Sequence, residues 1–187
     1  MKSLIVGLGN IGKEYEHSRH NIGLDILDEL SSKFEGSFSS EKHAFIHKGK
    51  YKGRTIILLK PTTFVNLSGK AVNYWLQKEK IKLGNLLVVL DDLALPFGTL
   101  RMRKKGNDGG HNGLKNINEA LGTNNYARLR FGIGGQFHRG QQVDFVLGQW
   151  TEQERDSLKE RMEMVGKMVL SFCTAGVERT MSQFNNK

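Results

Sequence analysis

Residues 4–23 read LIVGLGNIGKEYEHSRHNIG, and the prediction of both the fold and the site starts from this stretch. The apolar run LIV predicts a short buried strand, and the glycines that follow predict a turn at the carboxyl end of that strand. Open α/β sheets bind their ligands at such ends. The loop then presents two polar groups with clear chemical uses, Asn10 and His20.

The glycines of this stretch also satisfy the G-x-G-x-x-G spacing of a dinucleotide site. That fingerprint opens directly into a helix, and an acidic residue follows it about 20 residues later. Here residues 13–20 are polar, and the helical pattern begins only after Asn21. We therefore interpret the glycines as shaping a loop that carries His20. A nucleotide-binding oxidoreductase remains a hypothesis that rests on the glycine spacing alone.

The composition indicates one domain and a polyanionic partner. A chain of 187 residues with 38% apolar content can bury one sizeable core, so we expect residues 1–187 to form a single domain. The net charge of +9 favours a negatively charged partner. Four of the cations gather within five positions, and a solvated basic face explains that cluster as well as a binding site does. They are Arg101, Arg103, Lys104 and Lys105.

The single cysteine and the lack of long apolar runs indicate the compartment. Cys173 has no partner for an intrachain disulfide, which suits a reducing environment, and its apolar neighbours predict a buried thiol. No run of about 18 apolar residues and no signal-peptide core occurs. We therefore expect a cytoplasmic protein that does not associate with membranes.

Apolar periodicity predicts alternating strands and helices along the chain. It predicts a helix over 22–35, a hairpin of strands 44–51 and 54–59 with its turn at Lys52-Gly53, and a buried strand over 86–90. The hairpin implies a mixed sheet. Asn66 or Ser68 is expected to cap the next helix.

The second half of the chain continues this alternation. We expect a strand over 99–103, a helix from Leu114, a strand from Arg128 whose arginines point outward, and a helix from Thr151 that opens with a capping box. A shorter helix is expected between residues 175 and 184. The whole pattern predicts an α/β fold, a three-layer sandwich whose twisted mixed β-sheet is flanked by helices.

The polar candidates follow apolar strands, so one fold could bring them to one rim of the sheet. They are Asn10, His20, Asn66, Asp91, His111 and Asn112. For three of them, Asn66 and the pair His111-Asn112, helix capping is an equally simple explanation. Asp91 also has a second interpretation, as part of the turn that ends its strand.

The residue types favour attack by water. No nucleophile elbow, zinc motif or redox pair occurs, and His17, His20 and His111 lack a recognised ligand spacing, so we expect no metal. A histidine with an aspartate partner can take a proton from water, and neutral amides can stabilise the oxyanion that forms. An activated ester suits this machinery. Together with the basic surface, it points to an ester attached to nucleic acid, such as an acyl group on the 3′ end of tRNA.

Several ordered blocks of the chain resemble the bacterial peptidyl-tRNA hydrolase family. The resemblance is carried by LIVGLGN-x-G, by RHN-x-G from Arg19 with Tyr15 before it, by KPTTFVNLSG, by DDLALPFG, by GGHNGL and by RLRFGIG. These blocks span nearly the whole chain. Together they are far more specific than the glycine spacing alone.

The resemblance implies hydrolysis of the ester between a peptide and tRNA, without a cofactor, by a monomer that contacts the acceptor stem and the CCA end. It implies that His20 is the general base, Asp91 orients it, and Asn10 completes the catalytic set. The substrate contacts it implies are Tyr15, Val65, Asn66, His111 and Asn112. The implied contacts to tRNA phosphate are Arg103 and Arg130, which would clamp the 5′ phosphate, together with Lys104 and Lys105.

Three residues depart from the pattern of the family. Ile11 stands in place of a proline, Val65 in place of a methionine beside Asn66, and Ala94 in place of an acidic residue. The resemblance also allows a second function, a non-catalytic RNA-binding relative like a plant organellar splicing factor. Because His20 is present, the enzyme is the favoured function. Whether residues 135–148 form a mobile lid is left open.

Overall fold

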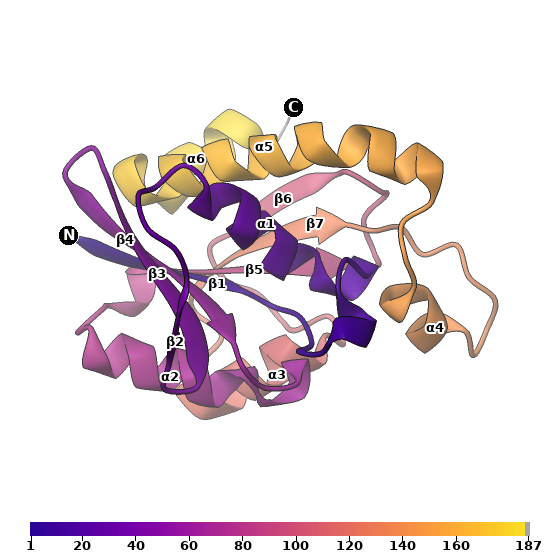
Figure 1. The fold of residues 1–187 in the computed structure, drawn as a ribbon, viewed down its shortest axis with the longest axis horizontal. Helices are drawn as coiled ribbons and strands as arrows, with labels where there is room; N and C mark the ends of the chain where they lie inside the picture. The colour runs from indigo at the N-terminus through magenta and orange to yellow at the C-terminus, as the bar shows by residue number, and fades with distance from the viewer. Residues whose placement is uncertain (186–187) are drawn as a thin grey trace.

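Four parallel strands form the centre of a seven-stranded sheet in the computed structural model, which describes residues 1–185 (Figure 1). They are β4 (Arg54–Pro61), β1 (Lys2–Gly7), β5 (Leu86–Asp92) and β7 (Ala127–Gly132), side by side in that order. The outer strands are antiparallel: β3 (Ala44–Tyr51) and β2 (Ser39–Glu41) extend one edge, and β6 (Leu100–Arg103) forms the other. The parallel strands therefore all end at one rim.

Helices cover both faces of this sheet and make three layers. On one face lie α1 (Ile22–Ser31), α5 (Glu152–Ala175) and α6 (Val177–Phe184). On the other face lie α2 (Ser68–Lys78) and α3 (Asn112–Leu121). The short helix α4 (Gln142–Leu147) stands apart from both layers, next to the loop that precedes α1 (Figure 1). The expected three-layer α/β sandwich with a mixed sheet is confirmed.

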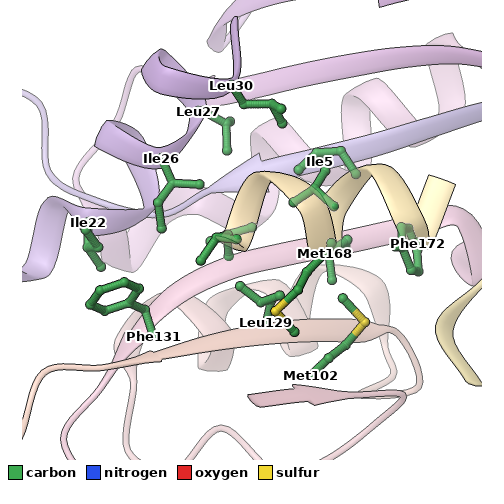
Figure 2. Packing of buried hydrophobic residues seen from close by; sticks show 14 of the residues in the cluster. Ile5, Ile22, Ile26, Leu27, Leu30, Met102, Leu129, Phe131, Met168 and Phe172 are labelled. Carbon is green, nitrogen blue, oxygen red and sulfur yellow. The ribbon is translucent and has the colours of Figure 1, made fainter. Parts of the chain in front are cut away.

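Side-chain alternation along the strands divides the core in two. In β1, Ile5 packs toward α1 and α5, whereas Leu4 and Val6 pack toward α2 and α3. Figure 2 shows the first of these clusters, in which Leu129 of β7 and Met168 of α5 approach each other between the sheet and the helices. Full burial of each such aliphatic side chain contributes about 1.5–3 kcal/mol, so both faces stabilise the sheet.

Several local predictions are confirmed. The β3–β4 hairpin turns at Lys52 and Gly53, whose φ angles of 46° and 73° are both positive, as a type I′ turn requires. The capping box forms at the start of α5, where the Thr151 hydroxyl accepts from the Glu154 N–H and the Glu154 carboxylate accepts from the Thr151 N–H. Cys173 is buried, and burial raises the pKa of its thiol to about 12.

Two predicted helix ends were wrong. The helix after the first loop ends at Ser31 instead of residue 35, because the chain there passes into a turn. Neither Asn66 nor Ser68 caps α2. A 3₁₀ turn, Val65–Leu67, precedes that helix, and the Ser68 hydroxyl donates to the Val65 carbonyl instead.

The prediction of outward arginines on β7 was also wrong for Arg128, which is fully buried. Its guanidinium donates to the carbonyls of Gly106 and Asn107 at 2.7 and 3.2 Å, and to that of Asn124 at 2.8 Å. Backbone acceptors thus replace the water that the charge loses on burial. Arg128 consequently anchors the start of the glycine-rich loop that leads to α3.

The first glycines of the chain serve packing and not the entry to a helix. A Cβ on Gly7 would lie 2.2 Å from the Gly23 carbonyl oxygen, so the end of β1 and the start of α1 can approach closely only without a side chain there. Two 3₁₀ turns, Lys13–Tyr15 and Arg19–Asn21, separate β1 from α1. The chain therefore lacks the direct strand-to-helix passage of a dinucleotide fingerprint.

None of the helices described within residues 1–185 combines the length and the apolar character needed to cross a bilayer.

Candidate active site

The pairing of β1 with β5 brings the first loop beside Asp91. Gly7 at the end of β1 aligns with Val89, two residues before Asp91, and the Leu8 N–H donates to the Val89 carbonyl at 3.0 Å. Asp91 lies at the end of β5 and is only 4% exposed. The loop folds back over this rim through the 3₁₀ turn that contains His20.

His20 and Asp91 form a hydrogen-bonded pair. The His20 Nδ1 atom lies 2.9 Å from Asp91 Oδ1. Burial lowers the pKa of His20, but the hydrogen bond to Asp91 and the charge of Asp91 outweigh burial, and the net pKa lies above its ordinary value. Since an ionised carboxylate can only accept, Nδ1 carries the proton and Nε2 keeps a free lone pair. The predicted meeting of these two residues is confirmed.

A second imidazole shares the same carboxylate oxygen. His111 Nε2 lies 2.9 Å from Asp91 Oδ1, and the two rings face each other with centroids 5.1 Å apart. His111 is also the N-cap of α3, because its Nδ1 atom accepts from the Gly113 N–H at 3.1 Å. The capping interpretation was therefore correct but incomplete. The second bond was missed because Asp91 is twenty positions away, and nothing local in the sequence indicates it.

The two imidazoles keep Asp91 ionised. Burial alone would raise the pKa of Asp91, but the charge of His111 and the hydrogen bonds from His111 and His20 outweigh it, so the pKa lies well below its usual range. A carboxylate that stays charged throughout the physiological pH range can hold an imidazole in one tautomer and stabilise its protonated form.

A cleft of about 240 Å³ opens beside this pair. Its polar lining includes His20, Asp91, His111, Asn112 and Arg130, and its apolar lining includes Val143 and Val146 from α4. The exposed Asn112 side chain stands at the first residue of α3. The cleft therefore joins a base, neutral donors and a cation beside an apolar wall.

Asn10 does not line this cleft but a separate hollow of about 420 Å³. Its side-chain oxygen accepts from the Val65 N–H at 2.9 Å, so its NH₂ group is directed elsewhere. Asn21, which the sequence analysis did not single out, accepts from the Asn10 N–H at 2.8 Å and donates to the Asn10 carbonyl at 2.9 Å. These two hydrogen bonds to the Asn10 backbone fix the position of Asn10.

Residues with aromatic and amide side chains extend this neighbouring surface. Tyr15 packs edge-on against Phe64, with ring centroids 6.3 Å apart, and Phe64 is 50% exposed. Val65 is buried and Asn66 is exposed, so their side chains face different surroundings. Neither Tyr15 nor Asn66 lines the cleft that contains His20.

The predicted phosphate contacts lie on the last two strands, β6 and β7, and in the loop directly after β6. Arg103 is exposed, whereas Arg130 is half-buried, and its Nε atom lies 3.4 Å from Asp92 Oδ2. Lys104 pairs with Glu178 at 2.9 Å, and both side chains are largely exposed. Lys105 is exposed. Since exposed pairs contribute little, the pairing of Lys104 does not prevent it from meeting a phosphate.

The nitrogens and the carboxylate at the centre of the site lie close enough together to resemble a metal site. The candidate atoms of His20, Asp91 and His111 all lie within 4.8 Å of one another. His111 Nδ1 already accepts a backbone N–H, so in the neutral ring the proton sits on Nε2, which faces Asp91. These hydrogen bonds are those of two imidazole N–H groups that donate to the Asp91 carboxylate, and they leave neither of the nitrogens that face Asp91 as a metal ligand. His17, the other histidine considered and rejected as a metal ligand from the sequence, lies elsewhere and bonds to Asp25 at 3.2 Å.

Comparisons with known proteins cover nearly the whole chain. A family model described as "Peptidyl-tRNA hydrolase" matches residues 4–187. The chain belongs to the peptidyl-tRNA hydrolase family. A peptidyl-tRNA hydrolase of Bacteroides fragilis is 58% identical over 187 residues, and one of Cytophaga hutchinsonii is 54% identical, each covering 100% of both chains.

A solved structure supports the family assignment at the level of the fold. The crystal structure of peptidyl-tRNA hydrolase from Acinetobacter baumannii superimposes with a TM-score of 0.91 at 31% identity, covering 98% of this chain and 94% of that one. The three departures from the family pattern lie around the site. Ile11 is 39% exposed beside Asn10, Val65 is buried under the same amide, and Ala94 lines the cleft.

Proposed function

We propose that this protein hydrolyses the ester that joins a peptide to tRNA, by means of a water molecule that His20 activates. Membership of the peptidyl-tRNA hydrolase family supports the reaction. One observation carries the mechanism: His20 donates Nδ1–H to the buried Asp91 and keeps Nε2 free at an open cleft. To activate water, an imidazole must be held in place by one ring nitrogen and must keep the lone pair of the other available to accept a proton.

In this mechanism the proton makes a round trip through His20. Nε2 takes a proton from water while the water oxygen bonds to the ester carbonyl carbon, and Asp91 stabilises the imidazolium that forms. When the tetrahedral intermediate collapses, the bond to the 3′ oxygen of the ribose breaks, and the imidazolium returns its proton to that oxygen. The products are a free peptide acid and a free tRNA hydroxyl, so His20 is regenerated.

Neutral amides supply the remaining chemistry. We assign Asn112, at the start of α3 beside the cleft, as a donor to the oxyanion and the peptide. Asn10 completes the catalytic set, because its oxygen is engaged by Val65 and its NH₂ group is left for a substrate carbonyl or the water. One well-placed oxyanion donor contributes about 3 kcal/mol to the transition state.

The tRNA is held by the surfaces on either side of the cleft. Arg103 and Arg130, with Lys104 and Lys105, bind the phosphates of the acceptor stem, because a guanidinium offers a forked, charge-assisted contact to phosphate. Tyr15 with its neighbour Phe64 meets the unpaired CCA end, whose bases can stack on aromatic rings. Val65, Asn66 and His111 complete the substrate contacts.

The same proposal covers the organisation of the protein. We propose that residues 1–187 form one catalytic domain that acts as a monomer in the cytoplasm, where its substrate arises during translation. A non-catalytic RNA-binding relative is not favoured, because the pair that a binding module would not need, His20 and Asp91, is intact and hydrogen-bonded. The curated relatives at 54–58% identity carry the name of the hydrolase.

Release of labelled N-acetyl-aminoacyl groups from tRNA by the purified protein tests this function. The wild type is expected to release the label and to leave plain aminoacyl-tRNA intact. His20→Ala is expected to lose at least about 10³-fold in kcat, because the general base is gone, while its affinity for tRNA stays unchanged. Equal hydrolysis by the two proteins would end the case for His20 as the base.

A further inference from the structure

Arg19 is a buried arginine directly before the base. It lies in the same 3₁₀ turn as His20 and is only 7% exposed. A buried guanidinium needs partners that replace water. Its Nη2 donates to Glu154 Oε2 at 2.8 Å, its Nη1 donates to the Phe145 carbonyl at 3.3 Å, and its Cζ atom lies 4.4 Å from the centre of the Phe145 ring.

These partners belong to two different elements. Phe145 is part of α4, and Glu154 is in the first turn of α5. The Glu154 atom that binds Arg19, Oε2, also accepts the Thr151 N–H at 2.7 Å. Arg19 therefore joins the turn of His20 both to α4 and to the fixed start of the longest helix.

The contacts with Arg19 are important for α4 because this short helix is only partly buried: Phe145 and Val146 pack against the edge of the hydrophobic cluster on the α1 and α5 face. None of its six residues is fully buried. Yet Val143 and Val146 of α4 form the apolar wall of the cleft opposite His20. The position of this wall thus depends in part on ties to the His20 turn, among them the hydrogen bond from the Arg19 N–H to the Gly148 carbonyl at 3.0 Å.

We propose that Arg19 is a positioning residue that holds α4 against the turn of His20 and thereby sets the width of the substrate cleft. Arginine suits this task because one planar fork reaches a carboxylate and a carbonyl while its face stacks on a ring. His20 is held separately by Asp91, so the loss of Arg19 should affect substrate binding more than chemistry. The inference rests on the proposed function for its kinetic part only.

The packing around Arg19 suggests that stability and positioning can be separated. Within residues 1–185 the Arg19 Nε–H has no hydrogen-bond partner, although it is buried. A buried ion pair with an unpaired donor stabilises a fold little, but removal of one partner leaves the other charge buried and alone. Arg19→Met should therefore lower stability, and adding Glu154→Gln should restore much of it by removing that charge.

Steady-state hydrolysis of N-acetyl-aminoacyl-tRNA by these variants tests the proposal. Arg19→Met is expected to raise KM roughly five- to tenfold while kcat falls less than about threefold, since the wall moves but the base does not. Arg19→Met/Glu154→Gln should recover its Tm and keep the raised KM. Thr151→Ala is the matched control, because it weakens the start of α5 without touching Arg19. It should lower Tm and leave KM unchanged.

Hydrogen exchange of the same proteins, followed by mass spectrometry, gives a readout that does not need activity. Arg19→Met and the double variant should exchange faster than wild type over residues 142–148, and Thr151→Ala should not. A wild-type KM in the double variant, or unchanged exchange over 142–148, would overturn the role of Arg19. A wild type without hydrolase activity would refute the proposed function, and the exchange data would still decide whether Arg19 holds α4.

Discussion

Two loops at the same rim of the sheet each deliver a histidine to Asp91, and they fix it in different ways. The loop after β1 holds His20 by one ring nitrogen and leaves the other free at the cleft. The loop before α3 holds His111 by both, one on Asp91 and one on the Gly113 N–H. A free lone pair on an otherwise fixed ring is the property of a base, and this difference supports the proposal that His20 catalyses while His111 has a supporting role.

The carboxylate between the two rings can serve both because it is buried. Two N–H donors replace the solvation that Asp91 lost on burial. Each imidazole therefore affects the other through Asp91. Because His111 also donates to the Asp91 carboxylate, the stabilisation of a protonated His20 by that carboxylate is weaker than it would be without His111. Variants of Asp91, of His111 and of the phosphate contacts should separate catalysis by His20 from the roles of its surroundings. The expected effects decrease in that order.

Asp91→Asn should have the largest effect. It removes the charge that stabilises the His20 imidazolium and allows the wrong tautomer of the ring, so kcat is expected to fall about 10²–10⁴-fold. Single-turnover hydrolysis of N-acetyl-aminoacyl-tRNA measures the loss. Binding of tRNA serves as the control and should be unchanged, because Asp91 is buried. A variant with near wild-type kcat would show that His20 needs no orienting carboxylate.

The pH profile should shift with the same substitution. The base must be neutral, so kcat/KM should rise with pH through the pKa of His20 and then level off. Asp91 holds this pKa above its ordinary value, so the midpoint of wild type should lie above about 6.5. Without the charge of Asp91, burial should dominate and the midpoint of Asp91→Asn should fall. A midpoint that is the same in both proteins would contradict the pairing.

His111→Asn should have a smaller effect of the opposite sign on the profile. Asparagine is a good N-cap, so α3 should keep its start, but the bond to Asp91 is lost because the side chain is shorter. More of the charge of Asp91 then acts on His20, and the midpoint should rise while kcat falls roughly tenfold.

His111→Ala is the companion variant for that experiment. It should match His111→Asn in its pH profile and lose about 1 kcal/mol more stability, because the cap is gone as well. Thermal unfolding measures this difference. If His111→Asn leaves both kcat and the midpoint unchanged, the second imidazole is only a helix cap.

Much of the fold could be predicted because it follows from local patterns. Continuous apolar runs define the central strands, Lys52-Gly53 fits its turn, and Thr151 with Glu154 forms the predicted cap. The errors arose where contacts with the rest of the fold, and not the local sequence pattern, determined the structure. Arg128 looks solvent-exposed by residue type, yet backbone carbonyls replace water around it, among them that of Gly106, which lies 22 positions away. Asn66 looks like a cap, but an extra turn precedes α2.

The site could be predicted only in part for the same reason. The sequence places polar residues after strands, which allowed the prediction that His20 and Asp91 meet at one rim, and the pairing of β1 with β5 brings them together there. His111 and Asp91 are separated by 20 positions in the sequence, and Arg19 and Glu154 by 135, yet each pair is hydrogen-bonded. Such contacts depend on the final packing of loops, which no period or motif encodes.

The smallest effects should come from the phosphate contacts, because these side chains contact neither histidine. Arg103→Ala should weaken tRNA binding roughly three- to tenfold and reduce the salt slope of log K by slightly less than about 1, because one exposed cation no longer meets a phosphate. Lys104→Ala, the neighbour that pairs with Glu178, should change affinity less. Filter binding across a range of salt concentrations measures both. The pH midpoint should stay at the wild-type value in each, since neither side chain contacts His20, His111 or Asp91. A shift of that midpoint in Arg103→Ala would mean that the basic surface also tunes the base, and the division between binding and catalysis would then have to be abandoned.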